Sequence, residues 1–348
     1  MAMKLGLTLG TGGNKATVDM DYVREAENLG YDTVWTAEAW GSDALTPAAW
    51  VLAQTSKIKV GTGIVQMSAR TPSSVAMAAM SLDHLSGGRF ILGLGPSGPQ
   101  VIEGWYGVPY GRPLTRLREY VEIIRKILAR KEPLRHEGFH YQIPMTGEGT
   151  TGLGKPLKSV LHGNPDMKIV SAAISSAGVK AAAEIVDGFI PIYMDPDRYE
   201  VFEPDINAGL KKAGGGKSLS DFMVLAFCQV RMDDDLMAAR QPVRENLAFY
   251  IGGMGARDKN FYNDFAKRLG YVDAAVEIQD HFLAGRRKEA ADAVPDELID
   301  RTALVGPKER IIERLQDWKK ASDKGQVHTI VTRGASVDAL RVLAENVL

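Results

Sequence analysis

The sequence predicts an α/β fold made of repeated βα units with a parallel sheet. Short apolar runs alternate with amphipathic stretches at intervals of about 25–30 residues, which is the rhythm of such units. Eight strand-like runs can be counted along the 348 residues. A chain of this length fits either two ordinary domains or one α/β barrel, so the residues alone leave open whether the sheet is closed.

The predicted strands are apolar runs that end in glycine, proline or polar residues. In chain order they cover Lys4–Gly10, Thr33–Glu38, Ile58–Gln66, Arg89–Gly95, Lys168–Ile174, Gly188–Met194, Phe222–Met232 and His328–Arg333.

Helices are predicted where apolar residues recur every three or four positions. Leu114–Arg130 carries its apolar residues on one stripe with charges opposite, which predicts an outer helix. Pro72 suits the first helical position of a helix over Ser73–Leu85. The other predicted helices cover Asp19–Leu29, residues 175–188 and Val337–Leu348.

Two intervals between predicted strands are much longer than the others. Residues 132–167 contain a hairpin-like HEGFHYQIP followed by a glycine- and threonine-rich stretch, and residues 233–327 form a helical region. Insertions on such folds enlarge the rim around the site, so residues 132–167 are a candidate lid. A surface insertion without function is the alternative. The absence of a linker favours a single domain over residues 1–348.

Composition excludes several classes of function. The formal net charge is −1 and the charges are dispersed, so there is no basic stripe for nucleic acid. The single cysteine, Cys228, rules out an internal disulfide framework. The N-terminal stretch lacks the apolar core of a signal peptide, and no run is long enough to span a membrane. We therefore expect a soluble, cytoplasmic protein without membrane partners.

The stretch Gly93–Gly98 matches the G-x-G-x-x-G spacing of dinucleotide-binding turns. That fingerprint belongs to the first βα unit, whereas three predicted strands precede it here. Pro96 and Pro99 also disfavour a direct passage from strand to helix, and Glu103 lies in the predicted loop that follows. We therefore reject a Rossmann site and interpret the glycines as a strand-end loop.

The ends of the predicted strands offer small residues and backbone amides, a pattern that suits a planar cofactor. In both barrels and open sheets the site forms beyond the carboxyl ends of the strands. Ser175 and Ser176 precede a predicted helix, where an anion such as a phosphate could bind. Equally, one of them could simply cap that helix.

Metal and hydrolytic sites are not indicated. His136 and His140 are four residues apart, but the local pattern is that of a strand and no third ligand is evident. The sequence contains no G-x-S-x-G or H-E-x-x-H motif.

Taken together, four segments resemble the bacterial luciferase-like superfamily, and within it the branch that uses the deazaflavin coenzyme F420, including methylenetetrahydromethanopterin reductase. The resemblance is dense over residues 4–130, recurs at 168–194 and fades to a short LVGPKERIIERL. The segments are YDTVWTAEAWGSDALTPAA, the run from IKVGTGIVQMSARTPSS to GRFILGLGPSGPQVIEGWYG, RPLTRLREYVEIIRKIL and SSAGVKAAAEIVDGFIP.

The resemblance implies a single (β/α)8 TIM barrel, with insertions after strand 4 and between strands 7 and 8. It also implies a non-prolyl cis peptide after the third strand, at Gly63–Ile64, behind the cofactor ring. Further cofactor-binding residues are implied at the end of the fourth strand, by Gly95, Ser97 and Gly98, and after the fifth strand. The latter group comprises Ser175, Ser176 and Gly178.

One departure from the family concerns the catalytic acid. Many members have a histidine directly after the acid at the end of strand two, whereas this chain has Glu38-Ala39-Trp40. Glu38 is then the best candidate for a proton donor, with an ion-paired structural carboxylate as the alternative. Glu103 is a second candidate acid.

The resemblance implies an F420-dependent oxidoreductase that transfers a hydride between the reduced deazaflavin and an unsaturated, imine or iminium carbon of a small molecule. An FMN-dependent monooxygenase and a barrel that binds a ligand without turnover are the alternatives. Rim cations would suit the acidic tail of coenzyme F420; the candidates are Arg112, Arg116, Lys155 and Lys158. Family members are often homodimers, so we expect a homodimer.

Overall fold

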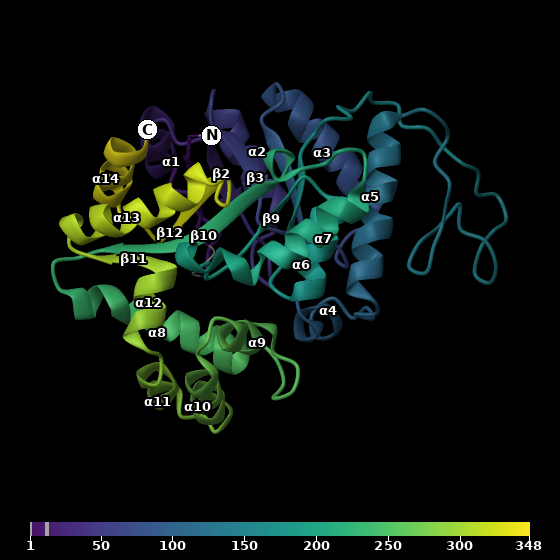
Figure 1. Ribbon diagram of the computed structural model, residues 1–348. Coiled ribbons are helices and arrows are strands. Elements are labelled where there is room, and N and C mark those ends of the chain that lie inside the picture. The colour runs from purple at the N-terminus through teal and green to yellow at the C-terminus, as the bar shows by residue number, and fades with distance from the viewer. Residues whose placement is uncertain (1, 11–13) are drawn as a thin grey trace. The chain divides into compact units, whose positions relative to one another are not determined.

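The computed structural model describes residues 2–10 and 14–348. The chain divides into two compact units, one formed by residues 1–35 and 173–348 and the other by residues 36–172. In each unit parallel strands alternate with helices along the chain (Figure 1). Among the described residues, no helix has the length and apolar character needed to cross a membrane.

The sheet of the first unit centres on the long strand β10 (Met223–Met232). On one edge β10 pairs with β12, which is followed by β1 and β2. On the other edge its first residues pair with β9 and its last residues with β11. All these pairings are parallel. The partner strands are β1 (Lys4–Thr8), β2 (Thr33–Thr36), β9 (Gly188–Ile190), β11 (Ala303–Gly306) and β12 (Thr329–Arg333).

Several helices of the first unit begin where a side chain caps their free amides. Asp19 accepts from Tyr22 N, and Ser336 accepts from Ala339 N, which satisfies donors that the helix itself leaves unpaired. The helices are α1 (Met20–Asn28), α6 (Ser176–Ile185), α7 (Glu203–Ala213), α8 (Leu236–Gly253), α9 (Phe261–Arg268), α10 (Val272–Leu283), α11 (Arg287–Asp292), α12 (Asp296–Thr302), α13 (Lys308–Asp323) and α14 (Val337–Val347), with short 3-10 helices η1 (Pro196–Val201) and η2 (Leu219–Asp221).

The second unit is built around β5 (Phe90–Gly95), whose six residues are all buried. β5 pairs in parallel with β3 and β4 on one side and with β8 on the other. Its strands and helices are α2 (Leu45–Gln54), β3 (Lys59–Thr62), β4 (Val65–Gln66), α3 (Pro72–Ser86), α4 (Pro99–Gly104), α5 (Pro113–Ala129) and β8 (Ile169–Ala172).

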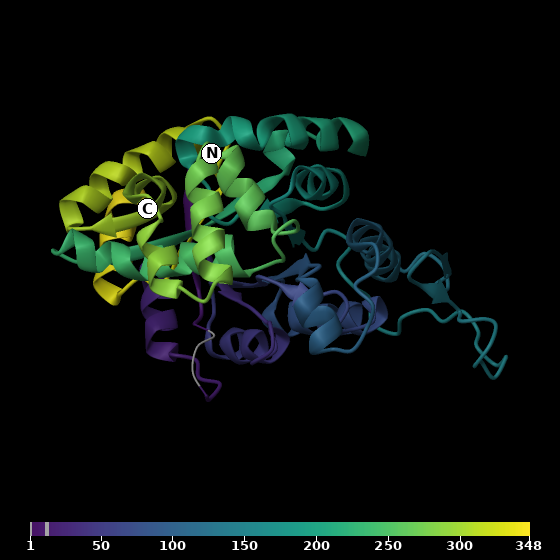
Figure 2. The ribbon, with the colours of Figure 1, turned by 90° about the horizontal axis from the view of Figure 1, so that it is seen from below.

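Residues 132–167 leave α5 as a hairpin and continue as an extended loop. The predicted hairpin is confirmed by the antiparallel strands β6 (His136–Glu137) and β7 (Gln142–Ile143). The loop that follows reaches away from the helices of its own unit in both ribbon views (Figures 1 and 2).

Each of the eight predicted strand ranges contains an observed strand, and the third contains two, β3 and β4. Two expectations were wrong. The region expected to be helical, residues 233–327, also contains the buried strand β11. A helix, α4, starts at Pro99, and Glu103 lies in this helix instead of in a loop. Proline is tolerated there because the first helical position has no intrahelical partner for its amide.

Candidate active site

Glu38 lies in the second unit and is almost completely buried, its side chain being 2% exposed. Its two carboxylate oxygens lie 2.7 and 2.9 Å from Arg70 Nη1. The backbone amides of Gln66 and Ala44 donate to the same carboxylate at 2.8 and 3.1 Å. Glu38 therefore joins the start of α2, strand β4 and the loop before α3. This is the ion-paired arrangement weighed as the alternative for Glu38; its part in proton transfer stays a prediction.

Arg70 is the charged partner that the sequence did not reveal. Burial lowers the pKa of its guanidinium, but the hydrogen bond and the charge of Glu38, together with the charge of Asp43, raise that pKa overall. The carbonyl of Arg70 accepts from Tyr120 Oη on α5 at 3.0 Å. Burial of Tyr120 raises the pKa of its phenol well above its usual range. The Glu38–Arg70 pair is thus tied to α5 as well.

Gln66, whose backbone amide donates to Glu38, also has a side-chain amide that lies beside the same segment. Its Nε2 donates to the carbonyls of Glu38 and Ala39, both at 3.1 Å. Its Oε1 is buried and has no hydrogen-bond partner among the described residues. Because a buried acceptor without a donor is costly, this oxygen is suited to receive a hydrogen bond from a bound molecule.

The peptide bond between Gly63 and Ile64 is cis, as the resemblance implied. It lies between β3 and β4, and Gly63 N donates to Thr36 O at 2.6 Å. Ile64 packs on Gly95, where an added Cβ would come within 2.8 Å of the Ile64 side chain. A Cβ at Gly93 would lie 1.7 Å from Thr62 O. These two glycines of β5 are therefore required by close packing against the β3–β4 segment.

The segment after β5 turns sharply into α4. Ser97 has a positive φ of 56°, and its carbonyl accepts from Tyr110 Oη at 3.1 Å. Gly98 caps α4 without a side chain, and its carbonyl accepts from the amides of Val101 and Ile102. Burial raises the pKa of the Tyr110 phenol, which therefore acts as a neutral donor to this loop.

In the first unit, both serines before α6 already have partners. Ser175 is the N-cap, and its Oγ accepts from Gly178 N at 3.2 Å. Ser176 Oγ donates to Asp205 Oδ1 at 2.6 Å. Helix capping, one of the two alternatives for this pair, is what the structure shows for Ser175.

A cation from the helical insertion lies beside this helix start. Arg268 on α9 donates to Ile174 O at 3.1 Å and to Val201 O at 2.5 Å, and it lies 3.6 Å from Asp205. Its positive charge, which Asp205 balances in part, adds to that of the α6 N-terminus, and both favour an anion in this place. Arg268 could not be predicted from local sequence, because it is separated from Ile174 by more than ninety positions.

Three of the four predicted rim cations are engaged inside the second unit, and one of them, Lys158, donates to Lys131 O at 3.1 Å. Arg116 binds Ser68 Oγ at 2.5 Å and contacts His140 Nδ1 at 3.3 Å, while Arg112 lies over the ring of Phe139. These contacts join α5 to the tip of the hairpin. Within the described ranges 2–10 and 14–348, no group of three or more His, Cys, Asp or Glu residues could hold a metal ion.

The model of one protein family, described as luciferase-like monooxygenase, matches residues 3–324. The chain belongs to this family. A Mycobacterium tuberculosis protein provisionally named as a coenzyme F420-dependent oxidoreductase is 45% identical to this luciferase-like chain, over 98% of both chains. The 5,10-methylenetetrahydromethanopterin reductase of Archaeoglobus fulgidus is 29% identical over 86% of this chain and 85% of its own.

Among solved structures, this luciferase-like chain is similar to the coenzyme F420-dependent tetrahydromethanopterin reductase of Methanopyrus kandleri. The TM-score is 0.80 at 24% identity, and the match covers 100% of this chain and 99% of that one. The predicted (β/α)8 TIM barrel fold is thereby confirmed.

The predicted site residues of this luciferase-like chain fall into two groups. Glu38, Gly63, Ile64, Gly95, Ser97 and Gly98 lie in the second unit; Ser175, Ser176 and Gly178 lie in the first. Sequence reasoning missed three polar side chains that contact these groups or their loops, namely Gln66, Arg70 and Arg268.

Proposed function

We propose that this chain is a coenzyme F420-dependent oxidoreductase. It would transfer a hydride between the reduced deazaflavin and an unsaturated, imine or iminium carbon of a small molecule. The observation that carries the proposal is the 45% identity, over 98% of both chains, to the M. tuberculosis protein named for this coenzyme. Because the family is described as luciferase-like monooxygenase, an FMN-dependent monooxygenase is the alternative, and FMN is the alternative cofactor.

The residues at the strand ends fit a flat, tricyclic ligand. The backbone around Gly63–Ile64 and Gly95 is closely packed and carries no titrating side chain, which suits contact with a ring. Gln66 supplies a buried acceptor that needs a donor. When bound, the cofactor itself supplies the hydride, so the protein has to position it and exclude water.

Within the first unit, the start of α6 would hold the phosphate of the cofactor's tail. Its free backbone amides favour an anion. Within the second unit, Ser97 and Gly98 form a half-buried turn that would contact the cofactor. Ser175, Ser176 and Gly178 would contact that phosphate through their backbone, because both serine hydroxyls are already engaged. Arg268 would add a positive charge.

Where the reaction requires a proton, Glu38 or solvent would supply it. The Arg70 guanidinium favours the carboxylate form of Glu38, so proton delivery from Glu38 requires this ion pair to loosen. The four hydrogen bonds of Glu38 also fix β4 and the start of α2. In this proposal Glu38 positions the β3–β4 segment whether or not it moves a proton.

Separate titrations with coenzyme F420 and with FMN test the choice of cofactor. We expect saturable binding of coenzyme F420 and oxidation of its reduced form when an unsaturated or imine substrate is present. Tight binding of FMN without binding of coenzyme F420 contradicts the proposal and supports the monooxygenase. Binding of coenzyme F420 without turnover on a broad substrate panel supports a ligand-binding barrel.

The homodimer is proposed on the apolar surface of the second unit. Trp50 on α2 and Met77 on α3 are 59% and 62% exposed, and α2 packs against α3. The extended loop of residues 132–167 exposes Leu153, Leu157 and Val160 to 75–89%. Exposed apolar side chains of this size are typical of protein interfaces. A second copy of the chain carries the same apolar side chains on its helices and on its loop, as a two-fold interface requires.

A further inference from the structure

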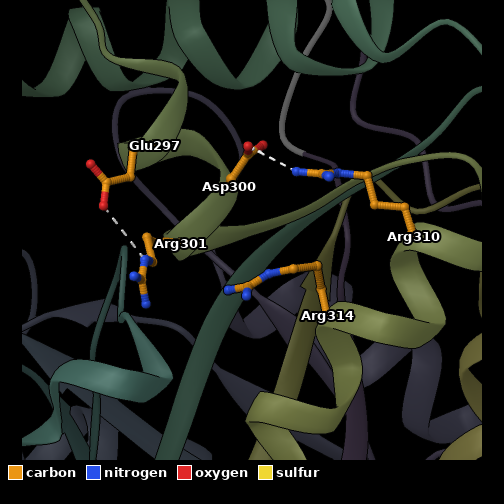
Figure 3. Close-up of a pocket in the computed structure, with 5 residues that line it drawn as sticks. All are labelled: Glu297, Asp300, Arg301, Arg310 and Arg314. Atoms are coloured by element: carbon orange, nitrogen blue, oxygen red, sulfur yellow. Dashed lines mark ion pairs between the residues drawn. The ribbon is translucent and has the colours of Figure 1, made fainter.

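A pocket of about 440 Å³ lies in the first unit between α12 and α13. Two residues of its wall, Arg310 and Arg314, come from the first turns of α13. The facing wall is formed by Glu297, Asp300 and Arg301 of α12 (Figure 3). None of these side chains is used by the proposed oxidoreductase site, and the volume is that of a small-molecule site.

Three guanidinium nitrogens at this pocket are buried without an acceptor. They are Nε of Arg310 and both Nε and Nη2 of Arg314, none of which has a hydrogen-bond partner among the described residues. Each arginine binds one carboxylate through a single Nη: Arg310 Nη2 lies 2.8 Å from Asp300 and Arg314 Nη1 lies 2.6 Å from Asp317. Buried charged donors without acceptors are costly and rare in proteins, and a bound anion would satisfy them.

The two walls differ in charge. The α13 wall presents two arginines, Arg310 and Arg314. Their carboxylate partners are each shared with a second cation, since Asp300 of α12 also binds Arg240 and Asp317 of α13 also binds Lys320. On the α12 side a single cation, Arg301, faces the two carboxylates of Asp197 and Glu297. The N-terminus of α13 has no side-chain cap, which adds to the positive potential of its wall. The pocket is therefore positive along α13 and negative along α12.

We propose that this pocket binds a small phosphate ester that carries hydroxyl groups. Its phosphate would accept hydrogen bonds from Arg310 and Arg314, because planar guanidinium groups match phosphate oxygens in pairs. Its hydroxyl groups would donate to the carboxylate of Glu297. The proposal is independent of the oxidoreductase function, since it rests only on residues of α12 and α13.

The test is isothermal titration calorimetry of the whole chain with two probes, inorganic phosphate and glycerol 3-phosphate. Saturable binding of both is expected, with the ester tighter. Substituting Arg314→Gln should weaken both by about tenfold or more, since a hydrogen bond to a charged group contributes that much. Glu297→Gln should weaken the ester and leave inorganic phosphate unchanged.

A second variant keeps the test informative if Arg314→Gln unfolds the protein. Asp317→Asn removes the competing carboxylate of Arg314, and we expect it to tighten binding of both probes several-fold. The matched control is Arg257→Gln, which removes an exposed arginine paired with Asp280 elsewhere in the unit and should bind both probes as the wild type does.

Four results would overturn the proposal. One is the absence of saturable binding of either probe in the millimolar range. A second is equal affinity of the wild type, Arg314→Gln and Asp317→Asn. The third is displacement of both probes by coenzyme F420, which would assign the binding to the proposed cofactor site. If inorganic phosphate binds as tightly as the ester and Glu297→Gln changes neither, the phosphate-ester proposal also fails, because the pocket then recognises free phosphate alone.

Discussion

Glu38 has two candidate roles, that of a catalytic acid and that of a structural carboxylate, and only its neighbours in the fold distinguish them. The sequence singled it out as an acid at a strand end. The structure surrounds it with Arg70 and the amides of Gln66 and Ala44, so its carboxylate is saturated with donors. A positioning role follows from these contacts directly, and a catalytic role requires the ion pair to open.

We expect Glu38→Gln to lower turnover and to leave affinity for coenzyme F420 nearly unchanged. The side-chain oxygen of the glutamine can still accept from Gln66 N, which keeps this anchor of the β3–β4 segment, whereas the bond from Ala44 N to the second carboxylate oxygen is lost. A proton donor contributes about 100-fold or more to the rate, whereas a purely positional group contributes less. Steady-state kinetics over a range of pH distinguishes the two. Glu345→Gln, which changes an exposed glutamate on α14, is the matched control with unchanged turnover expected. Equal turnover in Glu38→Gln and the wild type would remove Glu38 from the mechanism.

Gly93 gives a prediction on stability. Its missing Cβ lets β5 approach Thr62 O, so Gly93→Ala should destabilise the protein by about 3 kcal/mol through overpacking against rigid backbone. Gly104→Ala is the control, because a Cβ there meets no atom within 4 Å and alanine favours the helical conformation. Denaturant unfolding of both variants checks this. Equal stability of Gly93→Ala and the wild type would show that β3 and β5 are not so closely packed.

At the scale of elements, the hairpin β6–β7 is attached to α5 chiefly through Glu119. This buried carboxylate accepts from the amides of Phe139, His140 and Tyr141 at 2.8–3.1 Å. Burial raises the pKa of Glu119, but these three hydrogen bonds lower it overall. The hairpin tip is therefore held by an ionised side chain.

The sign of the pH dependence follows from the lowered pKa. Glu119 stabilises the folded hairpin above the pKa of a free glutamate, and this stabilisation is lost as the pH falls through the lower pKa of the folded state. We expect amide exchange in the hairpin to accelerate at acid pH. Glu119→Gln should show fast exchange already at neutral pH, while the exposed Glu137→Gln in the same hairpin should not. Identical exchange in Glu119→Gln and the wild type would contradict this attachment.

A comparison of the predicted and observed strands and helices shows which elements can be predicted from the sequence. The strands were predictable because apolar runs bounded by glycine and proline are local signals, and the hairpin was predictable for the same reason. Helix α4 was missed because Pro99 was interpreted as a breaker, although it is suited to a first turn. Strand β11 was missed because its four buried residues, ALVG, show no alternation and lie within a long helical region.

At the scale of the whole molecule, the exposed apolar side chains in the segment 36–172 predict self-association. We expect the wild type to be a dimer by light scattering. Trp50→Asp or Leu157→Asp should shift it to a monomer, because a buried unpaired carboxylate at an interface is strongly unfavourable. Met237→Asp is the control, since Met237 is equally exposed, at 58%, on α8 of the other unit. A monomeric wild type would contradict the homodimer.

The sequence by itself determined the order of the βα units, the barrel fold and the family, because periodicity and contiguous motifs are properties of neighbouring residues. It also located the Gly63–Ile64 peptide and the loops after the strands. Only the tertiary structure decided that Arg70 neutralises Glu38, that Arg268 reaches the start of α6, and that Arg310 and Arg314 keep unpaired donors at a pocket. These contacts join residues that are distant in the chain, or they depend on side-chain geometry. Local sequence patterns contain no information on either.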